Sequence, residues 1–182
     1  MNKKIISLAI ACLPVIVVPT AKASTGTITF NGEVTSSTCT VKVNGTSADA
    51  VVTLPTVSTS DLAADTVVAG RTTFTINLSE CTLDANQSQV VAFFESGTNV
   101  VATTGRLKNN GTAGNVSLQL LDAVNSSVIK AGDEGQKTSN TATTVAGDGT
   151  AILPYAVEYY AEGAAATAGT VTSSVTYSIH YM

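Results

Sequence analysis

Apolar and polar residues alternate through the last part of the chain, residues 169–182. Val171, Val175, Tyr177, Ile179 and Tyr181 fall on one side of that alternation. A period of two is typical of a β-strand with one buried face. The sequence ends on this strand, with no turn or returning strand to pair with its open edge. We therefore expect the backbone groups of that edge to be completed by another molecule.

The same alternation recurs at intervals along the chain. Phe74, Ile76 and Leu78 alternate with polar residues, as do Val116 and Leu118. The pattern predicts strands at residues 51–54, 71–78, 90–95, 116–121, 127–130 and 152–161. Turn residues lie between them, at 96–99, 109–111 and 147–149. Many short strands without alternating helices favour a β-sandwich, with a closed barrel as the alternative.

The β pattern near the N-terminus is too long for one strand. It covers residues 26–34 and continues through 35–43. Gly32 is a natural place for the chain to leave one sheet and enter another. We therefore expect a free arm at residues 24–33 and a domain at 34–182 whose first strand starts at Val34. Residues 58–64 are expected to form one helical turn capped by Ser58 or Thr59.

Residues 1–23 have the pattern of a cleaved secretory signal. Lys3 and Lys4 precede an apolar stretch, and Ala21 and Ala23 form a small-x-small cleavage site. A lipoprotein signal ending at Cys12 is the alternative, but apolar residues continue beyond Cys12. We therefore expect the remaining chain to be exported.

Charge and cysteine content narrow the functional classes. The formal net charge of −4 argues against nucleic acid and anionic membranes as partners. Once the signal is removed, Cys39 and Cys81 are the two remaining cysteines, and a disulfide is expected in an oxidising compartment. These two thiols and His180 are too few ligands for a structural zinc site.

The sequence contains little that favours an enzyme. His180 is the single histidine, and it alternates with the apolar face of the last strand, so we expect it to point away from the core. No nucleophile elbow, phosphate loop or zinc-helix motif is present, and we expect no cofactor. A carbohydrate-binding module or tip adhesin using Tyr155, Tyr159 and Tyr160 is the alternative, but tryptophan is absent and aromatic residues make up 5%. Tyr155 and Tyr159 share strand parity and are expected in the core.

These residues together resemble the subunits of chaperone–usher fimbriae, and most closely the type 1 major pilins. The resemblance covers the whole chain. It rests on the signal, the Cys39–Cys81 pair, the arm, three inner segments and the final strand. The arm reads Gly26-x-Ile28-x-Phe30-x-Gly32-x-Val34, and the inner segments are residues 116–122, 153–155 and 159–161. The most diagnostic part is the ending, with Gly169 fourteenth from the end and Tyr181 penultimate.

The resemblance implies an immunoglobulin-like β-sandwich that lacks its last strand and is completed by a donor strand from another subunit. A periplasmic chaperone first supplies a strand and an outer-membrane usher guides assembly. The arm of a neighbouring pilin, with Gly26, Ile28 and Phe30 on one face, then replaces the chaperone strand. The expected acceptor groove and chaperone-recognition residues are Gly169, Val171, Val175, Tyr177, Ile179, Tyr181 and Met182. The implied function is a structural subunit of a surface fimbria that supports adhesion, expected to be the major rod subunit, with a minor or adaptor subunit as the alternative.

Overall fold

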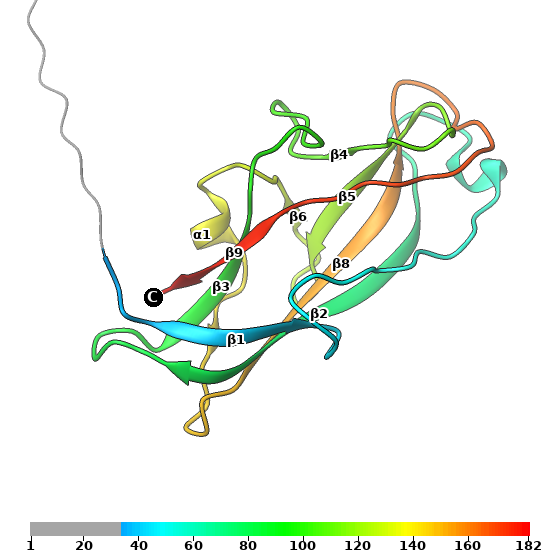
Figure 1. The fold of residues 1–182 in the computed structure, drawn as a ribbon. Helices are drawn as coiled ribbons and strands as arrows, with labels where there is room; N and C mark the ends of the chain where they lie inside the picture. The colour runs from blue at the N-terminus through cyan, green and yellow to red at the C-terminus, as the bar shows by residue number, and fades with distance from the viewer. Residues whose placement is uncertain (1–33) are drawn as a thin grey trace, which may run out of the picture. The chain divides into compact units, whose positions relative to one another are not determined.

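The computed structural model describes residues Val34–Met182, which form two β-sheets packed face to face (Figure 1). The arm residues Gly26, Ile28 and Phe30 and the expected signal lie outside the described residues. The larger sheet has the strand order β1-β2-β8-β5-β4, with β6 paired to β5. The smaller sheet has the order β7-β3-β9. The strands are β1 (Thr38–Val43), β2 (Val68–Thr82), β3 (Gln89–Phe94), β4 (Leu107–Lys108), β5 (Val116–Asp122), β6 (Val128–Ile129), β7 (Thr143–Thr144), β8 (Ala151–Ala161) and β9 (Tyr177–Tyr181).

The helical content of the described part is small. The 3-10 helix η1 (Thr59–Leu62) follows Ser58, whose hydroxyl accepts the Ser60 amide while Asp61 accepts the Ser58 amide. This reciprocal capping confirms the helical turn expected at residues 58–64. The helix α1 (Gln136–Ser139) was not predicted, because four residues are too short to show a helical period.

The predicted strands at 71–78, 90–95, 116–121, 127–130 and 152–161 are all strands, with corrected boundaries. β2 is longer than the predicted 71–78, because it pairs with β8 on one side and β1 on the other. The first domain strand begins at Thr38 and not at Val34. The predicted strand at 51–54 is wrong, since those residues pair with no other strand of the described chain. β4 and β7 were missed, being two residues each.

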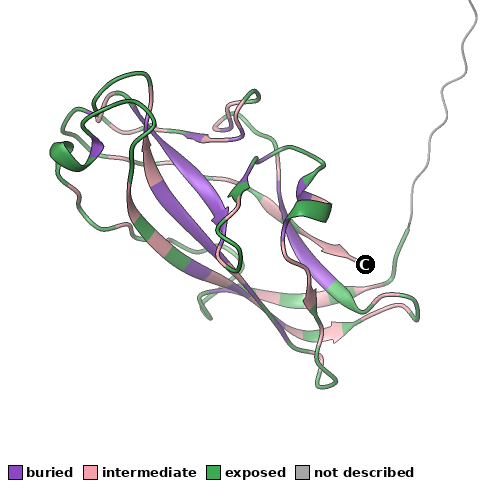
Figure 2. Ribbon diagram, turned by 180° about the vertical axis from the view of Figure 1, so that it is seen from behind, coloured by how far each residue is buried: buried purple, intermediate pink, exposed green. Residues whose placement is uncertain are grey.

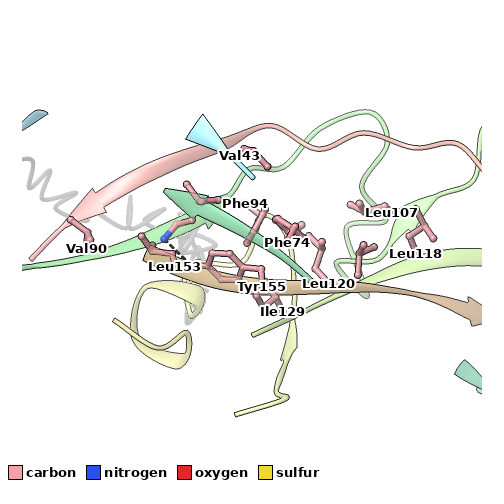
Figure 3. Close-up of a cluster of buried hydrophobic side chains, with 14 of the residues drawn as sticks. Val43, Phe74, Val90, Phe94, Leu107, Leu118, Leu120, Ile129, Leu153 and Tyr155 are labelled. Atoms are coloured by element: carbon pink, nitrogen blue, oxygen red, sulfur yellow. Dashed lines mark hydrogen bonds between the residues drawn. The ribbon is translucent and has the colours of Figure 1, made fainter. Parts of the chain in front are cut away.

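The core lies between the two sheets (Figure 3). Phe74 and Ile76 from β2 meet Leu118 and Leu120 from β5 and Phe94 from β3. Tyr155 of β8 is 2% exposed, and its ring packs edge-on against Phe94 at a centroid distance of 5.1 Å. Its hydroxyl accepts a hydrogen bond from the Ala92 amide at 3.0 Å. Tyr155 is therefore a core residue, as expected, and is not available to stack on a sugar.

The outer face of the larger sheet is covered over β5, where every residue is buried (Figure 2). Glu158 is 2% exposed and receives hydrogen bonds from Arg71 at 2.8 Å and Gln119 at 3.1 Å. Arg106 lies over the Tyr160 ring, 3.9 Å from its centroid. These charged and aromatic side chains cover the outer face of β5. The carboxylate of Glu158 also gives the buried Gln119 side chain a hydrogen-bond partner.

The disulfide joins β1 to β2 between Cys39 and Cys81, as expected from the cysteine count. The neighbouring Thr38 and Thr82 are paired across the two strands. The cross-link therefore holds the start of β1 against the end of β2.

Candidate functional site

An apolar cleft of about 750 Å³ opens between the C-terminal segment and the segment that follows β1. One wall consists of residues 172–179, and the other of Val41, Val43 and most of residues 48–54. The floor comes from strands of both sheets and belongs to the core: Phe74, Ile76, Phe94, Leu107, Leu118, Leu120 and Val157. The cleft is thus an uncovered strip of the sandwich core.

The C-terminal wall is bonded along one edge only. Met182 and Gln89 exchange both backbone hydrogen bonds, at 2.8 and 2.9 Å, and Glu95 donates to the Thr176 carbonyl at 2.8 Å. Backbone groups of alternate residues point to opposite sides of a strand, so those of Tyr177 and Ile179 point away from β3. In the described chain β9 pairs with β3 alone. The second edge of β9 therefore has free donors and acceptors.

The expected strand 169–182 is only partly correct, because residues 169–176 belong to no strand. They lie instead against an irregular loop: Ala113 donates to the Thr170 carbonyl at 3.0 Å and Asn110 to the Thr172 carbonyl at 2.8 Å. Loop backbone offers bonds at irregular intervals and cannot continue a ladder. The loop still bonds to the even-numbered residues Thr170 and Thr172, just as β3 bonds to the even-numbered residues of β9. The backbone of Val171 and Val175 thus points to the cleft side.

Gly169 is required where this segment meets the loop. A Cβ at this position would lie 2.3 Å from the amide nitrogen of Ala113, and one at Gly111 would lie 2.1 Å from the Thr170 carbonyl oxygen. Only two glycines allow the two backbones to approach this closely. Gly169 therefore allows the segment to run against this loop just before the cleft wall begins.

The apolar row of the C-terminal segment faces the core as expected. Val175, Tyr177 and Ile179 line the cleft, while Val171 and Tyr181 pack against the core beyond the cleft lining. Burial raises the pKa of the Tyr181 phenol, and a hydrogen bond with the Cys39 backbone opposes that rise. Ser173 interrupts the row, and its buried hydroxyl has no partner within the described chain.

The opposite wall was not identified from the sequence. Residues 51–54 are predicted as a strand, but in the structure Val51 is 89% exposed while Val52 and Leu54 pack against the core. Tyrosine hydroxyls hold this wall: Tyr159 donates to the Pro55 carbonyl at 3.1 Å, and Tyr177 donates to Ala48. The apolar residues of this stretch indicate its contact with the core, whereas the predicted strand pairing is wrong.

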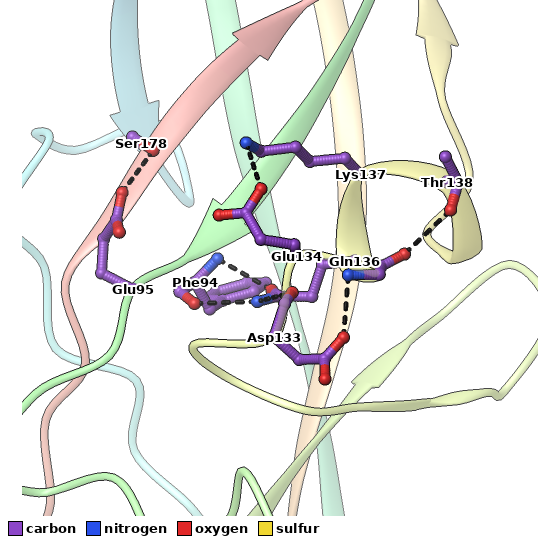
Figure 4. Close-up of polar contacts among 9 residues, drawn as sticks. Phe94, Glu95, Asp133, Glu134, Gln136, Lys137, Thr138 and Ser178 are labelled. Atoms are coloured by element: carbon purple, nitrogen blue, oxygen red, sulfur yellow. Dashed lines mark hydrogen bonds and ion pairs between the residues drawn. The ribbon is translucent and has the colours of Figure 1, made fainter. Parts of the chain in front are cut away.

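The far edge of β3 is closed by side chains (Figure 4). Gln136 accepts from the Phe94 amide and donates to the Phe94 carbonyl, both at 2.9 Å. Asn140 donates to the Ala92 carbonyl at 3.4 Å, beside the Ala92–Tyr155 bond. These side chains take the positions of a neighbouring strand. The cleft side of β9, by contrast, is paired with no strand of the described chain.

The described residues contain no group of three His, Cys, Asp or Glu side chains placed to hold a metal ion. No helix among them is long and apolar enough to cross a membrane.

Comparisons with known proteins agree with this geometry. The family model for the type-1 fimbrial protein, A, matches residues 54–182. The chain is 49% identical over 166 residues to the major fimbrial subunit SMF-1 of Stenotrophomonas maltophilia, covering 88% of this chain and 95% of that protein. It is 42% identical to the F17 fimbrial protein of Escherichia coli, covering 86% and 87%.

Solved structures show the same fold. The P pilus rod subunit PapA matches with a TM-score of 0.59 at 21% identity, covering 79% of this chain and 99% of that one. A chaperone–usher pilus structure, determined in work on rod uncoiling, matches with a TM-score of 0.55 at 22% identity, covering 91% and 100%. The sandwich is thus the immunoglobulin-like pilin fold. The chain belongs to the type-1 fimbrial protein family and is a structural subunit of a bacterial fimbria.

Proposed function

We propose that this pilin polymerises by donor-strand exchange, with residues 24–33 of one copy inserted into the cleft of the next. The observation that carries the proposal is the free edge of β9 beside an apolar cleft. An incoming strand would bond to that edge and cover the exposed core, which are the two elements of strand addition.

The dimensions of arm and cleft are compatible. A strand rises about 3.3 Å per residue, so a cleft wall of residues 172–179 accommodates about eight residues of an extended arm. Burying Ile28 and Phe30 would contribute roughly 3 to 6 kcal/mol. Each backbone hydrogen bond along the edge would add roughly 1 kcal/mol, before the cost of ordering the arm. We expect a joint that is slow to break.

The export route is the second part of the proposal. Residues 1–23 serve as the signal, and a periplasmic chaperone and an outer-membrane usher deliver the subunit to the surface. The chaperone covers the cleft first and recognises the C-terminal strand, including Tyr181 and the carboxylate of Met182. Deleting Tyr181 and Met182 is expected to lower the amount of subunit in the periplasm. An unchanged amount would contradict this recognition.

We also propose that the chain is a major rod subunit. The support is the 49% identity to a major fimbrial subunit, against 32% to the minor fimbrial subunit HifD of Haemophilus influenzae. Fimbrial family membership implies a structural role and no enzymatic activity. Its place is the surface fimbrium, where it supports adhesion.

The test is a charge placed on the buried face of the arm. Phe30→Asp is expected to leave chaperone-bound subunit at normal levels but to abolish polymer, because the side chain is free in the first state and buried in the second. Asn31→Asp is the matched control, since the same charge on the neighbouring residue falls on the other face of the arm. Polymer is measured as the multimer ladder on a denaturing gel without heating. Normal fibres from Phe30→Asp would refute the donor assignment.

A further inference from the structure

The residues between the arm and β1 are held by one acidic side chain of a distant loop. The hydroxyl of Thr35 donates to Asp84 Oδ2 at 2.7 Å, and the Ser36 amide donates to the same oxygen at 3.3 Å. The Ser36 hydroxyl donates to the second carboxylate oxygen. These bonds hold the pKa of Asp84 below its usual value, with the Ser36 hydroxyl as the largest cause, followed by the Thr35 hydroxyl and the Ser36 amide.

A second set of bonds joins the same two segments. The Asp84 amide donates to the Ser37 hydroxyl at 2.8 Å, and that hydroxyl also contacts Gln87 Oε1. Thr35 reaches Gln87 Oε1 at 3.3 Å. The loop is shaped by its own bond from the Gln87 amide to the Asp84 carbonyl at 2.9 Å. Side chains thus continue the contact between β1 and β2 beyond the Thr38–Thr82 pair and the adjacent disulfide.

The same loop also holds the end of the acceptor strand. The amides of Ser88 and Gln89 both donate to the Met182 carbonyl, at 2.7 and 2.9 Å. Figure 1 shows the C-terminus beside the start of the domain. Residues 84–89 therefore contact the point where the arm leaves the domain and the end of the strand beside the cleft.

We propose that Asp84 is a positioning residue for fimbrial assembly: with Gln87 it clamps residues 35–37 and so fixes the direction in which the donor arm leaves the subunit. The effect on the fibre rests on the proposed donor role of the arm. The contacts between residues 35–37 and Asp84 are independent of that role. In a chain of subunits, each arm links one domain to the cleft of the next. Fixing the arm exit relative to the subunit's own cleft sets the angle between successive subunits and stiffens the fibre.

The first measurement is amide hydrogen exchange in fibres taken from the cell surface. Asp84→Ala is expected to speed exchange at Ser36 and Ser37 at least tenfold, while the core amide of Ile76 is unchanged. Asp148→Ala is the matched control, because Asp148 is an exposed carboxylate that also accepts the amide and hydroxyl of one threonine, Thr150, but within its own turn. Unchanged exchange at Ser36 and Ser37 in Asp84→Ala would overturn the clamp.

The second measurement is fibre stiffness, taken as the persistence length in electron micrographs. Asp84→Ala is expected to form as much polymer as wild type, with a persistence length at least twofold shorter. Thr35→Val is expected to reproduce this effect, and Thr35→Ser, which keeps the hydroxyl, to restore wild-type stiffness. Faster exchange with unchanged stiffness would overturn the positioning role. An error in the donor-strand proposal itself would be recognised separately, because Phe30→Asp would then form normal fibres.

If Asp84→Ala forms no fibres, the Thr35 pair decides the question. Equal stiffness in Thr35→Val and Thr35→Ser would overturn the proposal, because the two side chains differ in the hydroxyl that contacts Asp84.

Discussion

The hydroxyl of Tyr177 donates a hydrogen bond to the carbonyl oxygen of Ala48 at 2.9 Å. Tyr177 belongs to β9 and Ala48 to the opposite wall, so this bond joins the two sides of the cleft. Burial raises the pKa of the Tyr177 phenol, and the nearby negative charge of Asp49 adds to the rise. The phenol therefore stays protonated and remains a donor at neutral pH.

Tyr177→Phe keeps the ring but removes the bond between the walls. We expect a loss of about 0.5 to 1 kcal/mol in the free energy of unfolding, because one partly exposed hydrogen bond is lost. The local effect is expected to be larger, with faster amide exchange across residues 49–52. The measurement is urea denaturation together with hydrogen exchange on the purified subunit. Unchanged exchange in that wall would show that Ala48 is held by other contacts.

Gly169→Ala tests the close approach at the start of the C-terminal wall. The added methyl group would overlap the backbone of Thr112 and Ala113, so we expect a loss of roughly 1 to 3 kcal/mol. Gly97→Ala is the control, because a Cβ there meets no heavy atom within 4 Å. The measurement is the urea midpoint of each variant. Equal midpoints for the two variants would contradict the steric role of Gly169.

Tyr155 contributes to the free energy of unfolding, and this contribution decreases at alkaline pH. Burial raises the pKa of its phenol from 10.0 to about 12, and the Asp122 charge adds to this while the Ala92 amide opposes it. The folded state therefore keeps the proton at pH values where the unfolded chain has lost it. Its contribution is complete below pH 10 and is lost as the pH rises towards 12, by about 2 to 3 kcal/mol in total.

The check is the difference in unfolding free energy between wild type and Tyr155→Phe as a function of pH. We expect this difference to be constant below pH 10 and to shrink between pH 10 and 12. Tyr155→Phe is also less stable at neutral pH by roughly 1 to 3 kcal/mol, because the buried Ala92 amide loses its partner. A difference that stays constant through this range would rule out the raised pKa.

The disulfide is expected to contribute about 4 kcal/mol by restraining the unfolded chain between Cys39 and Cys81. Reduction, or the double substitution Cys39→Ser and Cys81→Ser, should lower the urea midpoint accordingly. Reducing agent added to the double variant is the control and is expected to have no effect. A reduced wild type as stable as the oxidised form would show that the β1–β2 pairing suffices without the cross-link.

Local patterns in the sequence determined most strands and the side of each that is buried. Phe74, Ile76 and Leu78 alternate because β2 has one buried face, and the C-terminal row packs against the core as its alternation predicts. Successive side chains of a strand point to opposite faces of the sheet, so a few consecutive residues show which face is buried. The strand that pairs with them need not be known. The Ser58 cap is equally local.

The tertiary structure alone decided which extended segments are paired. Residues 51–54 and 169–176 are predicted as strands, yet neither has a strand partner in the described chain. Ser117 and Gln119 alternate as if exposed, yet both are buried and hydrogen-bonded to Glu162 and Glu158, which lie far along the sequence. Alternation sets which side of a segment faces the core. Backbone pairing and burial need a neighbour brought within bonding distance by the rest of the fold, and no strand among residues 34–182 takes that place along the cleft.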